Sequence, residues 1–308
     1  MTRSNPRGGL DKAGSIDKNL NGFEVLRPSE QTISVVIASP HSGRDYSLEF
    51  INQTRLDPRS LRRSEDSFVD EMFASAPING APLLRALFPR AFVDANREPY
   101  ELDAAMYSDT LPDYVNTNSR RVLSGLGTIA RIVANGVPIY GRKLSFAEAE
   151  ARINGYYRPY HAVLSRLIDD TVARFGGAIL LDCHSMPSSG GPLDNSLESG
   201  PIDIVLGDRH GQSCHPAITA MATRVLRGLG LNVRHNAPYA GGFTTGHYGA
   251  PDNGIHALQI EINRALYMDE IRFERRQGLG VMATHMARVI RALGTIDPAA
   301  LSLPLAAE

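Results

Sequence analysis

Short apolar runs recur along the chain and predict buried strands. Their hydrophobicity is continuous rather than alternating, which is typical of strands covered on both faces. The runs are residues 32–38, 91–95, 177–182, 202–207, 231–235 and 256–262. The sequence therefore predicts a sheet with helices packed on both sides.

Helical patterns lie between and after these runs. The longest begins at Ser145, which forms a capping box with Glu148, and it ends at Phe175, before two glycines. Pro159 lacks a backbone donor and disfavours helical geometry at Arg158, so we expect a break there. This segment is therefore expected to form two helices.

Two more helical patterns follow in the C-terminal half. One begins at Pro216 and ends near Gly228, and the other runs from about residue 269 to 293, weakened in its middle by Gly278 and Gly280. Strands that alternate with helices predict a single α/β domain with a mixed, mostly parallel sheet flanked by helices. In such sheets, functional side chains gather where the strands end.

The N-terminal segment and the overall charge narrow the class of protein. Residues 1–22 are polar and glycine-rich, so we expect a flexible segment before one domain over residues 23–308. The segment lacks the apolar core of about 7–15 residues that a signal peptide needs. No stretch approaches the roughly 20 apolar residues that span a bilayer. These two observations lead us to expect a cytoplasmic protein. A formal net charge of -1 gives no general attraction to nucleic acid or anionic lipid as binding partners.

Several common chemistries are excluded. With only two cysteines, Cys183 and Cys214, a finger-type zinc site is excluded, and free thiols in a reducing compartment are expected. Cys183 is next to His184, but neighbours on a strand point to opposite faces, so they do not form a nucleophile and its base. The G-x-S-x-G elbow of serine hydrolases and a G-x-G-x-x-G fingerprint after a strand are absent.

Two histidines follow directly after predicted strands. His41 comes after residues 32–38 in the turn Pro-His-Ser-Gly, and His184 comes after residues 177–182. Asp182 could orient a ring nitrogen of His184, as carboxylates behind metal ligands do. Each histidine alone could simply bond to loop backbone. Together they favour a metal site, since imidazole is a common zinc ligand.

A third ligand is expected from the acidic segment 63–71. Glu65, Asp66 and Asp70 are the candidates, and Asp66 and Asp70 would share one face of a helix. An acidic helix face is more often simply solvated than bound to a metal. Residue types and spacing do not choose between the three acids.

Glu261 lies inside the apolar run 256–262. A carboxylate in such a strand must be paired, metal-bound or functional, because burying a bare charge is costly. Burial also raises its pKa toward the range that suits a general base. A salt bridge with Arg264 is the structural alternative.

Arginines and a glycine-rich segment indicate a small anionic substrate. Arg97 follows Asn96 after the run 91–95, and a guanidinium fits a carboxylate. Further arginines stand in glycine- and serine-rich surroundings at Arg120, Arg121, Arg131 and Arg142. Residues 236–249 combine glycines with aromatic residues and show little helix or strand character. They are expected to form either a mobile substrate loop or a plain connection.

Taken together, eight segments resemble the N-formylglutamate amidohydrolase family. They are SPHSG (39–43), EDSFVD (65–70), FPRAFVDANREP (88–99), GLGTIAR (125–131), RPYH (158–161), LDCHSMP (181–187), NAPYAGGFTTGHYG (236–249) and LQIEINRALYMDE (258–270). They occur in the expected order, so the resemblance covers nearly the whole domain.

The resemblance extends to the zinc carboxypeptidase and aminoacylase superfamily and implies a zinc site. The implied ligands are His41, Asp66 and His184, with Glu65 as the second choice for the acid. Those peptidases carry His-x-x-Glu after the first strand, whereas Arg44 stands at the glutamate position here. The acid ligand is therefore expected from residues 65–70.

The remaining roles also come from the resemblance. Glu261 is implied as the general base. Asn96 and Arg97, with one or more of Arg121, Arg131 and Arg264, are implied to hold the substrate carboxylates.

The implied reaction is hydrolysis of N-formyl-L-glutamate to formate and L-glutamate, in histidine breakdown. The partner would then be a small acidic amide, with zinc or another divalent cation as cofactor, and the oligomeric state stays open. One alternative is a metallohydrolase for another N-acyl amino acid or a peptide. Another is a non-catalytic binder of acidic metabolites.

Overall fold

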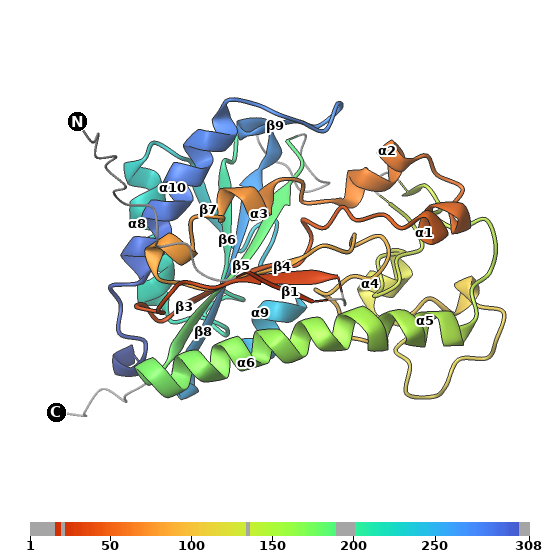
Figure 1. Ribbon diagram of the computed structural model, residues 1–308, viewed down its shortest axis with the longest axis horizontal. Helices are drawn as coiled ribbons and strands as arrows, with labels where there is room; N and C mark the ends of the chain where they lie inside the picture. Colours follow the sequence, from red (N-terminus) through yellow and green to blue (C-terminus); the bar gives the residue numbers. More distant parts are fainter. Residues whose placement is uncertain (1–15, 20–21, 134–135, 189–200, 302–308) are drawn as a thin grey trace, which may run out of the picture.

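A mixed eight-stranded sheet forms the centre of the computed structural model, with helices on both of its faces (Figure 1). The structure describes residues 16–19, 22–133, 136–188 and 201–301. In chain order the strands are β1 (Ile16–Asn19), β2 (Phe23–Leu26), β3 (Val35–Ser39), β4 (Leu83–Ala86), β5 (Ala178–Met186), β6 (Ile204–Gly207), β7 (Val233–His235) and β8 (Ile255–Asn263).

The strand order across the sheet is β1-β2-β4-β3-β5-β8-β6-β7. The central neighbours β4, β3, β5 and β8 run parallel, as do β6 and β7. The pairs β1–β2, β2–β4 and β6–β8 are antiparallel. The predicted fold class, a single α/β domain with a mixed and mostly parallel sheet, is therefore confirmed.

Long helices cover the sheet, and the remaining helices are short. The helices are α1 (Leu48–Gln53), α2 (Pro58–Leu61), α3 (Val69–Met72), α4 (Arg120–Leu123), α5 (Phe146–Arg152), α6 (Arg158–Phe175), α8 (Pro216–Gly228), α9 (Phe243–Tyr248) and α10 (Gly278–Leu293). A small separate pair of strands, β9 (Met268–Asp269) and β10 (Glu274–Arg275), lies before α10.

Two apolar cores lie on opposite faces of the sheet. Val36 and Leu180 belong to the core that contains α6, whereas Val35 and Leu181 belong to the core that contains α3, α8 and α10. Successive residues of a strand point to opposite faces of the sheet. A strand that is covered on both faces therefore needs apolar residues at every position. This two-sided burial explains the continuous hydrophobic runs.

The predicted strand at residues 91–95 is wrong. Ala91 and Val93 are buried in the core, but this segment forms a turn, in which the Val93 amide donates to the Pro89 carbonyl. Burial without sheet pairing produced the same apolar pattern. The short strands β2 and β4 were missed, and β4 is interrupted by the half-buried Arg85.

The segment forms two α-helices as expected, but the chain is not broken at Pro159. A π-helical turn over residues 153–157 joins α5 to α6, and Pro159 stands in the first turn of α6, where a missing backbone donor is tolerated. The capping box of Ser145 and Glu148 is confirmed.

Three further boundaries differ from expectation. The last helix begins at Gly278 rather than near residue 269, because residues 268–275 form β9, β10 and the turn between them. Residues 236–249 contain the helix α9. Most of the predicted flexible segment 1–22 lies outside the described residues, but residues 16–19 pair with β2 as a strand.

Two glycines of α10 give a stability prediction with an internal control. A Cβ added at Gly278 would lie 1.8 Å from the Leu266 carbonyl oxygen, whereas one added at Gly280 would meet nothing within 4 Å. We expect Gly278→Ala to lower the free energy of unfolding by about 1–3 kcal/mol, the usual cost of overpacking. Gly280→Ala should raise it by up to about 1 kcal/mol through helix propensity. Urea unfolding of both variants measures this, and equal effects would contradict it.

None of the helices in the described part of the chain combines the length and the hydrophobicity that crossing a bilayer requires. Cys183 and Cys214 are both buried and are not bonded to each other. The Cys183 side chain belongs to the core under α8 and α10, on the face opposite His184.

Candidate metal centre and active site

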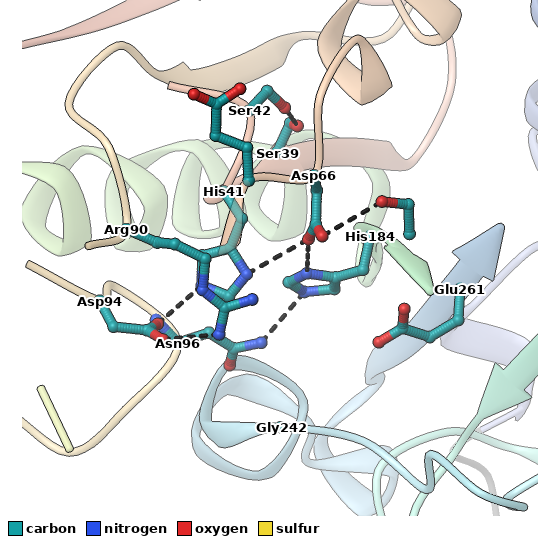
Figure 2. A network of polar contacts seen from close by, with 12 residues as sticks. Ser39, His41, Ser42, Asp66, Arg90, Asp94, Asn96, His184, Gly242 and Glu261 are labelled. Atoms are coloured by element: carbon teal, nitrogen blue, oxygen red, sulfur yellow. Dashed lines mark hydrogen bonds and ion pairs between the residues drawn. The ribbon is translucent and has the colours of Figure 1, made fainter. Parts of the chain in front are cut away.

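Three neighbouring parallel strands bring distant residues to one edge of the sheet. His41 lies two residues beyond β3, and His184 and Glu261 are direct register partners on β5 and β8. Parallel strands end at the same edge, so residues far apart in sequence meet there. Figure 2 shows both imidazoles and the Glu261 side chain around one small region.

Asp66 reaches this region from the loop before α3. Its backbone amide donates to the His41 carbonyl at 3.0 Å, and the amide of Asp70 donates to Ser42 Oγ at 3.2 Å. These two bonds tie the acidic loop to the turn that carries His41. Oδ2 of Asp66 lies 2.9 Å from His184 Nδ1 and 3.3 Å from His41 Nδ1 (Figure 2).

The other two candidate acids have partners of their own. Glu65 accepts hydrogen bonds from Arg62 at 3.1 Å and from Tyr46 at 2.8 Å. Asp70 pairs with Arg85 at 2.9 Å. Of the three candidates, the structure therefore brings only Asp66 to the histidines.

A carboxylate lies behind each imidazole. Oδ1 of Asp94 is 2.6 Å from His41 Nε2, and Oδ1 of Asp182 is 3.0 Å from His184 Nε2. The spacing of Asp182 and His184 predicted this second contact. Carboxylates at one ring nitrogen orient the other nitrogen toward a metal ion. Here both Nδ1 atoms are left to face Asp66.

The electrostatics of the group favour positive charge between its members. Burial opposes charge on His184, but the neighbouring Asp182 and Asp66 carboxylates raise its pKa well above the usual value. Burial would likewise raise the pKa of Asp66, yet hydrogen bonds and charge from His184 and His41 hold it well below the usual range. A cation would be stabilised at this position by the same carboxylates.

The donor set fits a divalent metal ion. One ligand atom each from His41, Asp66 and His184 can be chosen so that all lie within 4.8 Å of one another, and all three residues are buried. Nδ1 of His41 has no hydrogen-bond partner although it is buried. Two imidazoles and one carboxylate match the donors of catalytic zinc sites, which keep a further position open.

Glu261 borders this group on the side of β8. Its side chain is buried, and Gln259 Nε2 donates a hydrogen bond to it at 2.9 Å. Among the described residues, Glu261 forms no ion pair with an arginine, so the salt bridge to Arg264 is not observed. Burial, opposed by His184 and reinforced by Asp66, raises the pKa of Glu261 to about 7.

A cavity of about 280 Å³ opens beside the group. His41, Asp66, His184 and Glu261 line it together with the arginines Arg63, Arg90, Arg97, Arg121 and Arg264. Its other walls include Tyr239, Gln259 and the glycines 241 and 242. With Asp94 the lining contains three carboxylates against five guanidiniums, so the cavity suits an anionic ligand.

The predicted substrate arginines occupy different places. Arg264 lines the cavity but also pairs with Asp66 at 3.2 Å, so it supports the Asp66 carboxylate. Arg97 is buried and donates to the carbonyls of Leu126 and Asn96. Arg121 lines the cavity, whereas Arg131 pairs with Asp103 outside it.

Asn96 lies against the group of potential metal ligands. Its Nδ2 lies 3.0 Å from His184 Nε2 and 3.3 Å from Asp182, while its Oδ1 accepts a hydrogen bond from the Thr244 amide in α9. Both ends of the amide therefore contact other protein groups. Residues 236–249 pack against the site through this contact.

Sequence reasoning missed three residues of the site. Gln259 precedes Glu261 by two positions on β8, and the two-residue period of a strand could have placed it beside Glu261. Asp94 was an acid within a buried run, the same signal that singled out Glu261. Arg90 pairs with Asp94 at 2.7 Å, and no sequence signal distinguishes it from other arginines.

The fold and the site define an α/β protein with a buried group of potential metal ligands at the edge of its sheet. The chain belongs to the N-formylglutamate amidohydrolase family, whose sequence model matches residues 33–268. The family resemblance predicted from the eight segments is thus confirmed. The wider relation to zinc carboxypeptidases stays a prediction.

Known proteins agree with this assignment. Two N-formylglutamate deformylases, from Pseudomonas aeruginosa and Pseudomonas putida, are each 27% identical over 250 residues, which is 80% of this chain and 86% of theirs. The crystal structure of an N-formylglutamate amidohydrolase from Ralstonia eutropha JMP134 is 34% identical, with a TM-score of 0.82 over 89% of this chain and 98% of that one. A gene product from Agrobacterium tumefaciens, 19% identical with a TM-score of 0.53, shares the fold.

Proposed function

We propose that this protein hydrolyses the formamide bond of N-formyl-L-glutamate with the help of a divalent cation. The observation that carries the proposal is the buried group of His41, Asp66 and His184, with Glu261 at its side, in a chain of this family. The two Pseudomonas relatives are deformylases of this substrate. The products would be formate and L-glutamate, as in histidine breakdown.

Two imidazole nitrogens and a carboxylate oxygen are donor atoms that would suit zinc or another divalent cation. A cation bound there would make water more acidic and polarise the formyl carbonyl. Asp94 and Asp182 would keep the two Nδ1 atoms aimed at it. Arg264 would fix the Asp66 carboxylate through its contact with Oδ1.

Glu261 would act as the general base and then as the acid. It takes a proton from water as the water oxygen bonds to the formyl carbon. It gives that proton to the amide nitrogen as the carbon–nitrogen bond breaks, which releases L-glutamate as the amine. A pKa near 7 suits both transfers, since the group can hold and release a proton near neutral pH.

The arginines of the cavity would position the substrate through its carboxylates. Arg97 and Arg121 line the cavity beside Asn96, so they would fix the amide against the attacking water. Fixed orientation of two reacting groups contributes to rate by removing their freedom of motion. Asn96 lines the same cavity, and its Oδ1 holds α9 in place through the Thr244 amide.

A hydrolysis assay tests the proposal directly. We expect formate release from N-formyl-L-glutamate by protein loaded with zinc, loss of activity after dialysis against a chelator, and recovery when zinc is returned. N-acetyl-L-aspartate and small peptides serve as competing substrates. Faster turnover of one of these would replace the proposed substrate, and micromolar binding without any turnover would favour a non-catalytic binder.

The pH dependence of kcat/KM should report Glu261. The base must be deprotonated to accept a proton, so activity is lost as the pH falls through its pKa. Burial raises the pKa of Glu261 to about 7, and a nearby cation would lower it again because positive charge favours the carboxylate. We therefore expect a decline with a midpoint at or somewhat below pH 7, measured in the zinc-loaded enzyme. A profile that is flat down to pH 4 would contradict this role.

A further inference from the structure

A second cavity of about 490 Å³ adjoins the one beside His41, Asp66 and His184. Asn96, Arg97, Arg121 and the glycines 241 and 242 line both cavities, so the two share a wall. Asn96 lies beside His184, and Gly242 lies next to Asn96 (Figure 2). A molecule whose amide sits at the metal group could therefore extend past them into the second space.

Two guanidiniums that line this second cavity have no hydrogen-bond or ion-pair partner among the described residues. In the described ranges, the side chains of Arg121 and Arg209 form no hydrogen bond or ion pair. Arg90 and Arg264, by contrast, are bound to Asp94 and Asp66. Charged side chains that line a cavity unpaired can bind an incoming carboxylate without first breaking a contact.

Arg209 is built into the wall of this cavity. Its backbone amide donates to the Ala240 carbonyl at 2.7 Å, and its φ of 54° lies in the left-handed region. Its side chain lies against two glycines: a Cβ at Gly241 would be 2.9 Å from Arg209 Cγ, and one at Gly246 would be 3.0 Å from Cζ. A side chain at Gly246 would therefore crowd the guanidinium in its present position.

The charge of the second cavity is positive overall. Arg97, Arg121 and Arg209 line it, against the carboxylates of Glu98 and Glu101. Glu101 is buried, and its carboxylate accepts a hydrogen bond from the Glu98 amide at 3.3 Å. An anionic group that enters would therefore meet Arg121 and Arg209 as its available partners.

We propose that Arg209, together with Arg121, binds the side-chain carboxylate of the substrate in the second cavity and thereby selects acidic N-acyl amino acids. This assignment rests on the proposed function. The α-carboxylate of formylglutamate is close to the amide and must stay in the first cavity. The side-chain carboxylate lies two bonds farther from the formyl carbon, so it can reach across the shared wall.

A comparison of two isosteric substrates tests the assignment. N-formyl-L-glutamine has the shape of N-formyl-L-glutamate but a neutral side chain. We expect Arg209→Gln to lower kcat/KM for formylglutamate at least about 10-fold, as loss of a charged hydrogen bond does, and to change that for formylglutamine less than about 2-fold. Arg209→Lys should lose less than Arg209→Gln, because it keeps the charge. Arg166→Gln, an exposed arginine of α6, is the matched control and should change neither.

Equal losses for both substrates, or no loss for formylglutamate, would overturn the assignment while the proposed function stands. If the wild-type protein does not hydrolyse formylglutamate, the proposed function fails, and calorimetry still tests the cavity. Glutarate should then bind wild type at least about 10-fold tighter than Arg209→Gln, whereas glutaramate, its monoamide, should bind both alike. Unchanged glutarate affinity would overturn the assignment in that case too.

Discussion

Replacing Glu261 by glutamine is expected to lower kcat by at least about 10²-fold while the protein keeps its metal. Glutamine preserves the size of the side chain and can still bond to Gln259, but it cannot accept a proton from water. A general base supplies rate enhancement of this order. Both measurements use the zinc-loaded variant. Steady-state formate release gives kcat, and mass spectrometry gives the metal content.

Glu274→Gln is the matched control for this change, since Glu274 is an exposed glutamate on β10. It should leave kcat within about 2-fold of wild type. Two results would remove the proposed role of Glu261. One is turnover within a few-fold of wild type in Glu261→Gln, and the other is loss of the metal, which would make Glu261 a ligand.

Replacing Asp66 by asparagine is expected to abolish both metal binding and activity. Asp66 is the carboxylate between the two Nδ1 atoms, and its charge would offset much of the positive charge of the cation. His184→Ala should have the same effect, because it removes a second donor. We expect less than about 0.1 metal ion per chain after dialysis, where wild type keeps about one, since losing one of three protein ligands weakens binding by orders of magnitude.

Glu65→Gln separates the two acids that the sequence left as first and second choice. Glu65 is adjacent to Asp66 and equally buried, but it is bound by Arg62, Tyr46 and Ser67. We expect this variant to keep its metal, even where its stability falls. Metal retained in Asp66→Asn and lost in Glu65→Gln would reverse the assignment.

The sheet could be predicted from the sequence because its central strands are buried on both faces. Continuous apolar runs predicted β3, β5, β6, β7 and β8, each within a few residues. The same signal failed at residues 91–95, because burial alone does not distinguish a strand from a buried turn. It also missed β4, where Arg85 reaches out to Glu24 and Asp70.

By itself, the sequence determined the α/β class, the family, and which histidines and which glutamate end up at strand ends. Those inferences depend on local pattern: an apolar run followed by a polar side chain fixes where that side chain stands on the sheet. Only the tertiary structure decided which acids and arginines lie at the site and which pair with other side chains. Glu65 and Asp66 are neighbours of the same chemical type, and only the path of the loop turns one toward Arg62 and the other toward the histidines. The partners of a charged side chain are set by packing between distant segments, which local sequence does not encode.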